Sequence, residues 1–347
     1  MGGADQVREL FSEHSVLVDG ALRKLFAELP VLGMYQHQAY FMGFLSEELK
    51  PIELAAGKRF RSSLCTFLGE CYGARDATLP VALSVELYHN FTLIHDDIVD
   101  GDELRRGRAT VWKLFGTDHA INSGDAQLLL ALEVILESNN LTAEQKVLVQ
   151  LFLTKQYRKV VEGQFLDFEL TKMKLGDGGV SKQAYIEMIE RKTADLIVAV
   201  GKGAGLVAGV SKEELDLLET YTRSLGMAYQ ICDDVVSIWG EGSTTGKRAY
   251  GDLLERKKTL PVLHAYENLP HEEKQALLHI YTDEQPMTNE RCEAVIALLD
   301  GIETKKVMRV EIEAYAQAAK VAAMKLNIAE EKKVLLATIV DTLLPSV

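Results

Sequence analysis

Residues that cross-link or interrupt a chain are scarce in this sequence of 347 residues. It contains four cysteines and seven prolines, and no proline occurs between Pro80 and Pro261. The cysteines form no C-x-x-C pair, so their spacing indicates neither a zinc site nor a disulfide framework, and we expect free thiols in a reducing compartment. Because proline breaks helix interiors, the long proline-free stretch permits long helices.

Long apolar runs are also lacking. No run reaches the ~18 residues that a membrane-spanning helix needs, and the most apolar stretch, 196–210, is interrupted by Lys202 and by glycines. The first residues lack the basic and then apolar regions of a signal peptide. We therefore expect a cytoplasmic protein with no stable membrane insertion.

Positive charge is in deficit, because the formal net charge is −13. A face that binds nucleic acid or an anionic membrane needs clustered lysine and arginine, so we exclude both partners. A small anionic ligand is still compatible with this charge, since a few bases and a divalent metal can form a local positive site.

Helical signals run through the chain. In the segment 213–225 one helical face carries four residues at helical spacing: Leu215, Leu218, Thr222 and Leu225. Thr142–Gln145 and Ser211–Glu214 are typical capping boxes at helix starts. Alternating strand patterns, tandem repeats and interdomain linkers are scarce or not visible. We predict an all-α protein with one domain over residues 1–347 and roughly ten or more helices.

Two acidic segments stand out. Asp96, Asp97 and Asp100 end an apolar stretch that we predict as a helix over 81–100, and three unpaired carboxylates in one turn repel each other. Asp233 and Asp234 follow a second apolar stretch. A single acidic cluster is usually a solvated helix end, but two such clusters favour a cage of oxygen ligands, which suits Mg²⁺.

Basic residues are placed to complete a diphosphate site. One diphosphate would be held through metal and another by arginine and lysine directly. His89 lies seven residues before Asp96 on the same helical face, although a lone histidine there is more often a core residue. Each basic pair taken alone is typical of a solvated surface. The basic segments are Gly57–Arg61, Arg105–Gly107, Arg191–Thr193, Gly246–Lys247 and Arg256–Thr259.

These residues together resemble the trans-isoprenyl diphosphate synthases, or polyprenyl synthetases. The resemblance runs from about Gly57 to Pro261. The matching segments are Gly57–Arg61 (G-K-x-x-R), Asp96–Asp100 (D-D-x-x-D), Arg105–Gly107, Gly163–Asp167 (G-Q-x-x-D), Lys192–Thr193, Tyr229–Asp234, Gly246–Lys247, Asp252–Leu253 and Lys257–Pro261.

The resemblance implies an isoprenoid synthase fold, a helical bundle around a central active-site cavity, and a homodimer. It implies head-to-tail condensation of isopentenyl diphosphate with an allylic diphosphate, with three Mg²⁺ ions and the bound diphosphate. It assigns Mg²⁺ ligation to Asp96, Asp100 and Asp233, with Asp97 beside them, and contact with the allylic diphosphate to Arg105, Lys192 and Lys247. It assigns contact with isopentenyl diphosphate to Lys58, Arg61, His89 and Arg106, and substrate contact to Lys257. Thr193 and Gln230 would lie near the allylic cation.

Three departures from the family pattern are visible. Ser237 stands where a third aspartate of the second motif is usual, with Glu241 nearby. Ala109 and Trp112 stand where proline and histidine are common, and Arg256 replaces a usual glycine. The first departure makes the second motif a less complete match to the family, and we still expect activity.

Product length is predicted from the residues before the first acidic segment. Phe91 lies five residues before Asp96, and a bulky ring there would form a floor that stops elongation, which Tyr88 would reinforce. By resemblance we predict geranylgeranyl diphosphate, with farnesyl diphosphate as the alternative; both rings could instead be ordinary core aromatics.

Two further alternatives stay open. A terpene cyclase of the same fold would not need the isopentenyl site formed by Lys58, Arg61, His89 and Arg106. A non-catalytic partner subunit of a prenyl synthase would usually lose one or both acidic motifs, and this chain keeps both leading aspartates of each.

Overall fold

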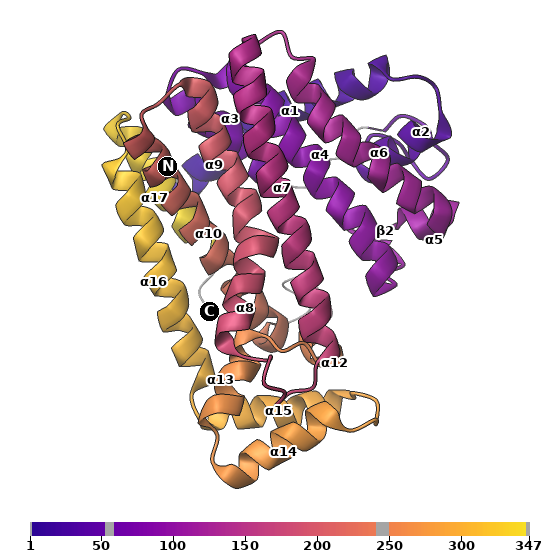
Figure 1. Ribbon diagram of the computed structural model, residues 1–347, viewed down its shortest axis with the longest axis vertical. Coiled ribbons are helices and arrows are strands. Elements are labelled where there is room, and N and C mark those ends of the chain that lie inside the picture. Colours follow the sequence, from indigo (N-terminus) through magenta and orange to yellow (C-terminus); the bar gives the residue numbers. More distant parts are fainter. Residues whose placement is uncertain (1, 53–58, 241–249, 345–347) are drawn as a thin grey trace. The chain divides into compact units, whose positions relative to one another are not determined.

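The computed structural model describes residues 2–52, 59–240 and 250–344. Within these residues the chain is almost entirely helical and has one two-stranded antiparallel ribbon (Figure 1). The all-α expectation is therefore confirmed. The chain forms two compact units: the first comprises Met1–Tyr157, Ala199–Leu218 and Asn327–Leu335, and the second comprises Arg158–Val198, Glu219–Leu326 and Leu336–Val347. A single domain over 1–347 stays a prediction.

The elements follow one another with short connections. Those of unit 1 are α1 (Gly3–Glu28), α2 (Gly33–Phe41), α3 (Phe60–Cys71), α4 (Arg75–Asp100), β1 (Leu104–Arg105), β2 (Arg108–Ala109), α5 (Val111–Phe115) and α6 (Thr117–Leu136). Those with residues in both units are α7 (Ala143–Lys172), α9 (Asp195–Ala208), α10 (Lys212–Trp239) and α17 (Glu330–Leu343). Those of unit 2 are α8 (Lys182–Ile189), the π-helix η1 (Glu190–Ala194), α12 (Gly251–Leu254), α13 (Leu260–Asn268), α14 (His271–Thr282), α15 (Asn289–Gly301) and α16 (Thr304–Lys325).

Helix α4 is the central element of unit 1, where it packs against α3 and α6. It begins six residues before the predicted start at 81, so Pro80 lies inside it. Proline leaves the carbonyl four residues earlier without its helical partner, and the side-chain amide of Asn140 donates to that carbonyl, on Asp76, at 3.0 Å. The replacement contact explains why a proline is tolerated there.

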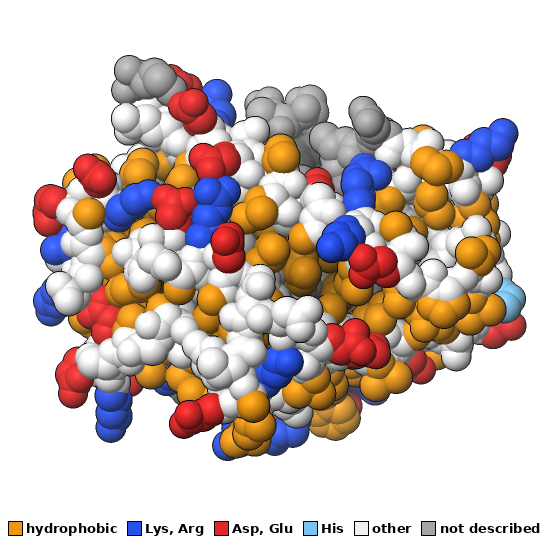
Figure 2. All heavy atoms as spheres, turned by 90° about the horizontal axis from the view of Figure 1, so that it is seen from above, with side chains coloured by type: hydrophobic (Ala, Val, Ile, Leu, Met, Phe, Trp, Pro, Cys, Tyr) orange, Lys and Arg blue, Asp and Glu red, His pale blue; other side chains and the backbone are white. Residues whose placement is uncertain are grey.

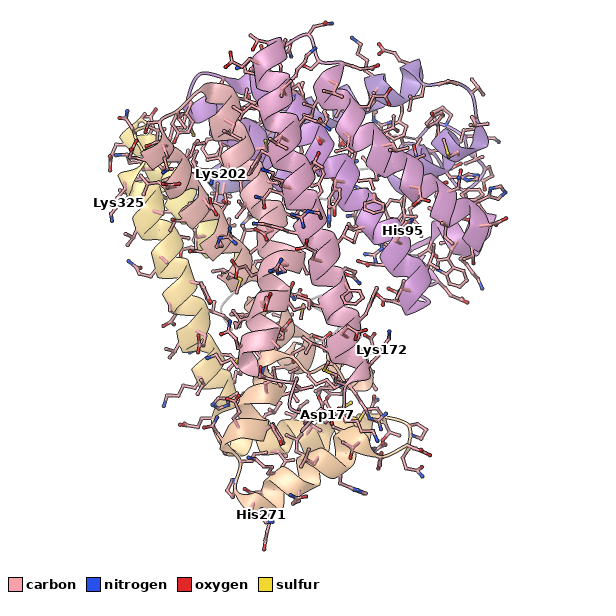
Figure 3. The ribbon with its side chains drawn as sticks, viewed as in Figure 1. His95, Lys172, Asp177, Lys202, His271 and Lys325 are labelled. Carbon is pink, nitrogen blue, oxygen red and sulfur yellow. The ribbon has the colours of Figure 1, made fainter. Side chains whose placement is uncertain are left out.

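Gly124 of α6 leaves room for a side chain of α4. A Cβ at Gly124 would lie 2.4 Å from Nε2 of His95, a residue of α4 that is labelled in Figure 3. The imidazole reaches past the glycine toward the carbonyl oxygen of Ile121, at 3.2 Å. A side chain at position 124 would therefore displace the imidazole from this contact.

The predicted helix starts agree with the structure. The amide of Thr142 donates to Oε1 of Gln145 at 2.9 Å, and the amide of Gln145 donates to Oγ1 of Thr142 at 3.2 Å, so the first capping box is confirmed. The amide of Glu214 donates to the Ser211 hydroxyl at 3.3 Å, as the second box predicts. On the predicted face of α10, Leu218, Thr222 and Leu225 are fully buried.

Unit 2 has its own apolar core, which is formed by residues such as Ile231, Val235, Leu263 and Val295. Helices α13, α14, α15 and α16 pack on one another in this unit, and the three shorter ones lie beside the end of α16 at which the chain enters it (Figure 1). The loop after α7 is held locally, because the amide of Lys174 donates to the carboxylate of Asp177, a residue labelled in Figure 3.

The ribbon of β1 and β2 was not predicted from the sequence. Its register pairs Leu104 with Ala109 and Arg105 with Arg108, which leaves Arg106 and Gly107 as a two-residue turn. Both turn residues have positive φ, 53° and 75°, and arginine at the first position gives no turn signal of the Asn-Gly kind.

The surface agrees with the charge analysis. On the face drawn in Figure 2, lysine and arginine side chains are interspersed with aspartate and glutamate rather than gathered in a broad basic patch. Among the described residues, every helix is too short or too polar to cross a membrane.

Candidate active site

The three carboxylates at the end of α4 are not equivalent. Asp96 is half-buried and Asp100 is exposed, whereas Asp97 is almost completely buried. Oδ1 of Asp97 accepts a hydrogen bond from Nε of Arg105 at 2.5 Å. Burial raises the pKa of Asp97 to about 6, against the opposing effect of Arg105. The expectation of three unpaired carboxylates is therefore wrong for Asp97, because its side chain turns inward to the arginine.

Basic side chains form a cluster around His89 of α4. Nη1 of Arg61 lies 3.1 Å from Nε2 of His89. Burial lowers the pKa of His89 well below its ordinary value, and the positive charges of four arginines act in the same direction: Arg61, Arg106, Arg105 and Arg59. A neutral histidine surrounded by guanidinium groups is the expected environment for a polyanion such as diphosphate. The predicted residues Arg61, His89, Arg105 and Arg106 are thus brought together in unit 1.

Arg59 is a buried member of this cluster. It has a left-handed φ of 42° at the start of α3, and its guanidinium donates to Asp19, Glu86 and the carbonyl of Met42 at 2.8, 2.8 and 2.9 Å. Since both carboxylates pair with it, its charge is balanced within the fold. We had assigned Arg59 no role from the sequence; its burial is visible only in the structure.

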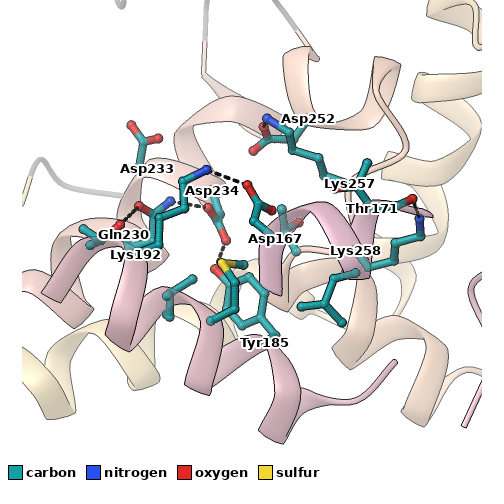
Figure 4. Close-up of a pocket in the computed structure, with 15 residues that line it drawn as sticks. Asp167, Thr171, Tyr185, Lys192, Gln230, Asp233, Asp234, Asp252, Lys257 and Lys258 are labelled. Atoms are coloured by element: carbon teal, nitrogen blue, oxygen red, sulfur yellow. Dashed lines mark hydrogen bonds and ion pairs between the residues drawn. The ribbon is translucent and has the colours of Figure 1, made fainter. Parts of the chain in front are cut away.

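The second set of predicted residues lines one cavity of about 230 Å³ in unit 2 (Figure 4). Lys192, Thr193, Gln230, Asp233 and Lys257 are all in its wall. The wall also contains Asp234 of the second acidic segment, and side chains to which the sequence gave no individual role: Asp167, Thr171, Tyr185, Asp252 and Lys258. Asp167, Asp234 and Asp252 fall in segments that match the family pattern, but no sequence signal marks Tyr185.

Two of the three lysines in the cavity wall face a carboxylate, and the third, Lys258, donates to the carbonyl of Thr171 at 2.7 Å. Nζ of Lys192 lies 2.5 Å from Oδ2 of Asp167, and Nζ of Lys257 lies 3.6 Å from Asp252 and 2.9 Å from Glu255 (Figure 4). An incoming anion would compete with these carboxylates for the ammonium groups. Lys192 and Lys257 thus both contribute their side chains to the cavity wall.

A chain of hydrogen bonds crosses the cavity wall. The hydroxyl of Thr193 donates to Oε1 of Gln230 at 2.7 Å, the amide nitrogen of Gln230 donates to Oδ1 of Asp234 at 2.9 Å, and the Tyr185 hydroxyl donates to the other oxygen of Asp234. Burial raises the pKa of Asp234, and the charge of Asp252 raises it further. Asp234 therefore positions its neighbours, while Asp233 is the half-buried carboxylate at the cavity.

Local backbone geometry places Lys192 and Thr193. They lie in the π-helix η1, and a π-turn inside a helix often marks a functional site. A Cβ at Gly163 of α7 would lie 2.2 Å from the Lys192 amide nitrogen, and one at Gly226 of α10 would lie 2.7 Å from Cα of Ala194. The two glycines let the neighbouring helices approach the π-turn closely.

Ser237 has a structural contact of its own. Its hydroxyl accepts a hydrogen bond from the amide of Asp252 at 3.1 Å, at the start of α12.

Helix α10 continues to Trp239, so Asp233 and Asp234 lie inside this helix. The expectation that they end a helical stretch is therefore wrong. Lys58, Lys247 and Glu241 lie outside the described residues.

Aromatic rings are layered on α4 before its acidic end. Phe91 contacts Tyr88 edge-on at 5.4 Å between ring centroids, and Tyr88 stacks on Tyr157 of α7 at 3.9 Å. Tyr88 and Tyr157 are buried, and the Tyr88 hydroxyl donates to the carbonyl of Tyr157 at 2.8 Å. Tyr157 was not predicted from the sequence, because it lies far from the acidic motif along the chain.

The donors fit an Mg²⁺ that keeps water and substrate oxygens among its ligands. Within the described ranges no three metal-binding side chains lie together, so these residues do not build a closed protein cage. The half-buried Asp96 and exposed Asp100 share one helical face, and Asp233 is a separate oxygen donor. Such open sets of carboxylates suit Mg²⁺ bound together with phosphate oxygens.

Comparison with known proteins gives consistent matches. The family model for polyprenyl synthetase matches residues 44–299. The (2E,6E)-farnesyl diphosphate synthase of Mycobacterium tuberculosis is 37% identical over 225 residues, which are 65% of this chain and 61% of that protein. The geranylgeranyl diphosphate synthase of Methanosarcina mazei is 36% identical over 214 residues, 61% of this chain and 64% of that protein. The chain thus matches less than two thirds of the length of these relatives.

The fold is shared over nearly the whole chain. A crystal structure of a polyprenyl synthetase from Streptomyces coelicolor superposes with a TM-score of 0.87 at 30% identity, covering 97% of this chain and 99% of that one.

Proposed function

Since the chain belongs to the polyprenyl synthetase family, we propose that it condenses isopentenyl diphosphate head-to-tail with an allylic diphosphate, in the presence of Mg²⁺. The observation that carries the proposal is the cavity of unit 2, where Lys192, Thr193, Gln230 and Asp233 share one wall although they are separated in sequence. The arginine cluster around His89 supplies a second anion site.

The residues divide the work as follows. Asp96, Asp100 and Asp233 would hold three Mg²⁺ ions with the allylic diphosphate, and bound Mg²⁺ would stabilise the charge that develops on the departing diphosphate. Lys192 and Lys247 contact the same diphosphate, and Arg61, His89 and Arg106 hold isopentenyl diphosphate, together with Lys58. Lys257 also binds substrate. Arg105 also contacts the allylic diphosphate, while its Nε is bound to Asp97 on the helix that carries Asp96.

The polar wall also bears on the reactive cation. The Thr193 hydroxyl and the Gln230 carbonyl oxygen lie in the wall as oriented dipoles. Dipoles fixed in advance stabilise developing charge without reorganising. No nucleophile of the protein is required. The allylic C–O bond breaks with its electron pair going to the diphosphate, the double bond of isopentenyl diphosphate attacks the allylic carbon, and the proton then lost from the isopentenyl unit goes to the departing diphosphate. The protein's task is to position the two substrates.

For the product we propose geranylgeranyl diphosphate, with farnesyl diphosphate as the second candidate. The buried layers of Phe91, Tyr88 and Tyr157 support a short product, because closely packed rings before the acidic end of α4 would obstruct a chain growing along that helix. The second candidate is supported by the similarity of the chain to the farnesyl diphosphate synthase of M. tuberculosis.

The test is turnover by the purified chain with Mg²⁺, isopentenyl diphosphate and each of three starters: dimethylallyl, geranyl and farnesyl diphosphate. Chromatography of the dephosphorylated products should give a twenty-carbon alcohol from every accepted starter. A hydrocarbon formed from farnesyl diphosphate alone would indicate a cyclase instead, and no turnover with any starter would favour a non-catalytic partner subunit.

We further propose a homodimer in the cytoplasm. Large apolar side chains are exposed along α6 and the start of α7 in unit 1: Ile121, Leu129, Leu136, Val147, Leu148 and Leu151. A row of this kind is typical of a surface covered by a second copy. The four cysteines form no disulfide, which supports a reducing compartment. Light scattering should give twice the chain mass, and Leu129→Glu should reduce it to one chain.

A further inference from the structure

The turn that carries Arg106 is strained. Arg106 has a φ of 53° and Gly107 a φ of 75°, and the ribbon around them has only two residue pairs. Such a short ribbon is not stable by itself, and a non-glycine residue in the left-handed region persists only where its surroundings impose it. Contacts from outside the ribbon must therefore hold the turn.

Arg108 makes the first of these contacts. Its guanidinium donates from Nη1 to the carbonyl of Tyr40 at 3.1 Å and from Nη2 to the carbonyl of Leu45 at 2.6 Å. The same group lies 4.2 Å above the ring of Tyr40. Arg108 thus fixes β2 to the end of α2 and to the segment that follows it.

Tyr40 makes the reciprocal contact. Its hydroxyl donates to the carbonyl of Ala109 at 2.6 Å, and its ring is only 2% exposed. The ring belongs to a small apolar cluster with Ile94 of α4 and Ala120 of α6. The two consecutive residues of β2 are therefore tied to one buried tyrosine, which is itself packed against the helix that carries the acidic residues.

The other end of the ribbon is closed by local contacts. The carbonyl of Asp102 accepts from the Thr110 hydroxyl and from the Trp112 indole, both at 2.8 Å. These bonds close the base of the loop, but they do not reach the turn.

Like charges act against the turn. The pKa of Arg106 is lowered by burial and then by the charge of Arg59, an effect that Glu86 opposes, and Arg105 and Arg61 lower it further. Repulsion among these guanidinium groups would push the turn away from the cluster in the absence of an anion. A rigid attachment of β2 opposes this movement.

We propose that Arg108 and Tyr40 are positioning residues for the diphosphate site: they clamp β2 so that the strained turn presents Arg106 to the diphosphate of the isopentenyl substrate. The inference rests on the proposed function only in taking a diphosphate as the ligand. Neither residue touches the anion, so both act through the turn. The acceptors of Arg108 are backbone carbonyls, so its replacement changes the position of the turn and leaves the charges of Arg105 and Arg106 in place.

The test measures binding of inorganic diphosphate, without metal and in the presence of a chelator, by titration calorimetry. We expect Arg108→Lys and Tyr40→Phe each to weaken binding about five- to tenfold, as the loss of a buried hydrogen bond predicts. Arg106→Gln serves as the reference for loss of the anion site itself. Tyr221→Phe is the matched control, because Tyr221 is also buried and its hydroxyl also donates to a backbone carbonyl, that of Leu336.

The unfolding midpoint of each variant is measured in parallel. Tyr40→Phe keeps the ring and therefore the packing. If Arg108→Lys does not fold, diphosphate binding by Tyr40→Phe alone tests the positioning role. In turnover, a positioning role predicts a raised KM for isopentenyl diphosphate with a nearly unchanged kcat, which a general loss of stability would not produce.

The outcomes separate the two proposals. Variants that bind diphosphate as tightly as the wild type overturn the positioning role, whatever the turnover shows, and so does a wild type whose binding is unaffected by Arg106→Gln. Weakened binding in both variants, together with a wild type that turns over no isoprenoid substrate, supports the clamp and rejects the proposed synthase activity.

Discussion

The hydroxyl of Tyr185 donates a hydrogen bond to Oδ2 of Asp234, and both side chains are buried in unit 2. The tyrosine comes from α8 and the aspartate from α10, one residue after the proposed metal ligand Asp233. The bond ties α8 to α10 beside the cavity, and the second oxygen of Asp234 accepts from Gln230, one turn earlier on the same helix.

We expect Tyr185→Phe to lower kcat about tenfold, since a hydrogen bond to a charged or partly charged buried group contributes about 1.5–3 kcal/mol. Asp234 would lose one of its two side-chain donors and Gln230 would be less well oriented. Steady-state kinetics at saturating Mg²⁺ measures the effect. Tyr221→Phe should leave kcat near the wild type, and an equal loss in both variants would contradict a specific role for Tyr185.

The neighbours Asp96 and Asp97 should respond differently to substitution. Asp96→Ala should lower turnover by roughly 100-fold or more at saturating Mg²⁺, because metal stabilisation of a leaving group supplies several kcal/mol. Asp97→Asn should retain most of the activity, since its amide oxygen can still accept from Arg105. Turnover of Asp96→Ala close to the wild type would refute the proposed metal site.

Phe91→Ala should lengthen the product. Removing the ring opens the first layer of the floor, so we expect products longer by one or more isoprene units, with Tyr88 and Tyr157 still limiting further growth. The space left by the missing ring should also destabilise the fold by about 3–5 kcal/mol. Chromatography of the products gives the length, with Phe11→Ala on α1 as control; an unchanged distribution would reject Phe91 as the floor.

Gly163→Ala should impair the enzyme through the π-turn. The new Cβ would lie 2.2 Å from the backbone nitrogen of Lys192 and 2.6 Å from its Cα, so η1 must move and carry Lys192 and Thr193 with it. We expect loss of turnover and a lower unfolding midpoint. Gly20→Ala in α1 is the control, because nothing lies within 4 Å of its Cβ position and alanine stabilises a helix by about 1 kcal/mol relative to glycine. Equal activity of both variants would contradict the proposed fit.

His14 should make stability depend on pH. It is fully buried, with Nδ1 2.8 Å from the Thr66 hydroxyl and Nε2 3.3 Å from Glu70. Burial lowers its pKa from 6.5. The charges of Arg75 and Lys332 also lower this pKa, whereas those of Glu70 and Glu13 raise it. A histidine whose pKa is lowered by folding makes its full contribution to stability above the pKa that it has in the unfolded chain. That contribution is lost as the pH falls from 6.5 toward the pKa of the histidine in the folded protein.

The measurement is the free energy of unfolding of the wild type minus that of His14→Gln, between pH 8 and pH 5. The difference should fall below pH 6.5, by at most about 1.4 kcal/mol per pH unit. A difference that stays constant over this range would show that His14 is protonated equally in both states.

Local patterns were enough for the helices and for much of the chemistry. The capping box at Thr142 and the buried face of α10 follow from hydrogen bonds and periodicities that span a few residues, so they could be read from the chain directly. The same holds for Asp96 and Asp100, whose shared face is set by helical spacing. The family pattern added the separate basic segments.

Tertiary structure decided what each charged group faces. Asp97 looks like its neighbour Asp96 in the sequence, but its position on α4 buries it against Arg105 of the ribbon. The strained turn at Arg106 is held by Tyr40, a residue more than sixty positions away, and no local signal predicts a conformation that is imposed by distant contacts. Pairing and burial depend on which helices pack together, so the sequence by itself determined the residue types and their spacing, and only the packing decided which of them bind, which position others and which stack as a floor.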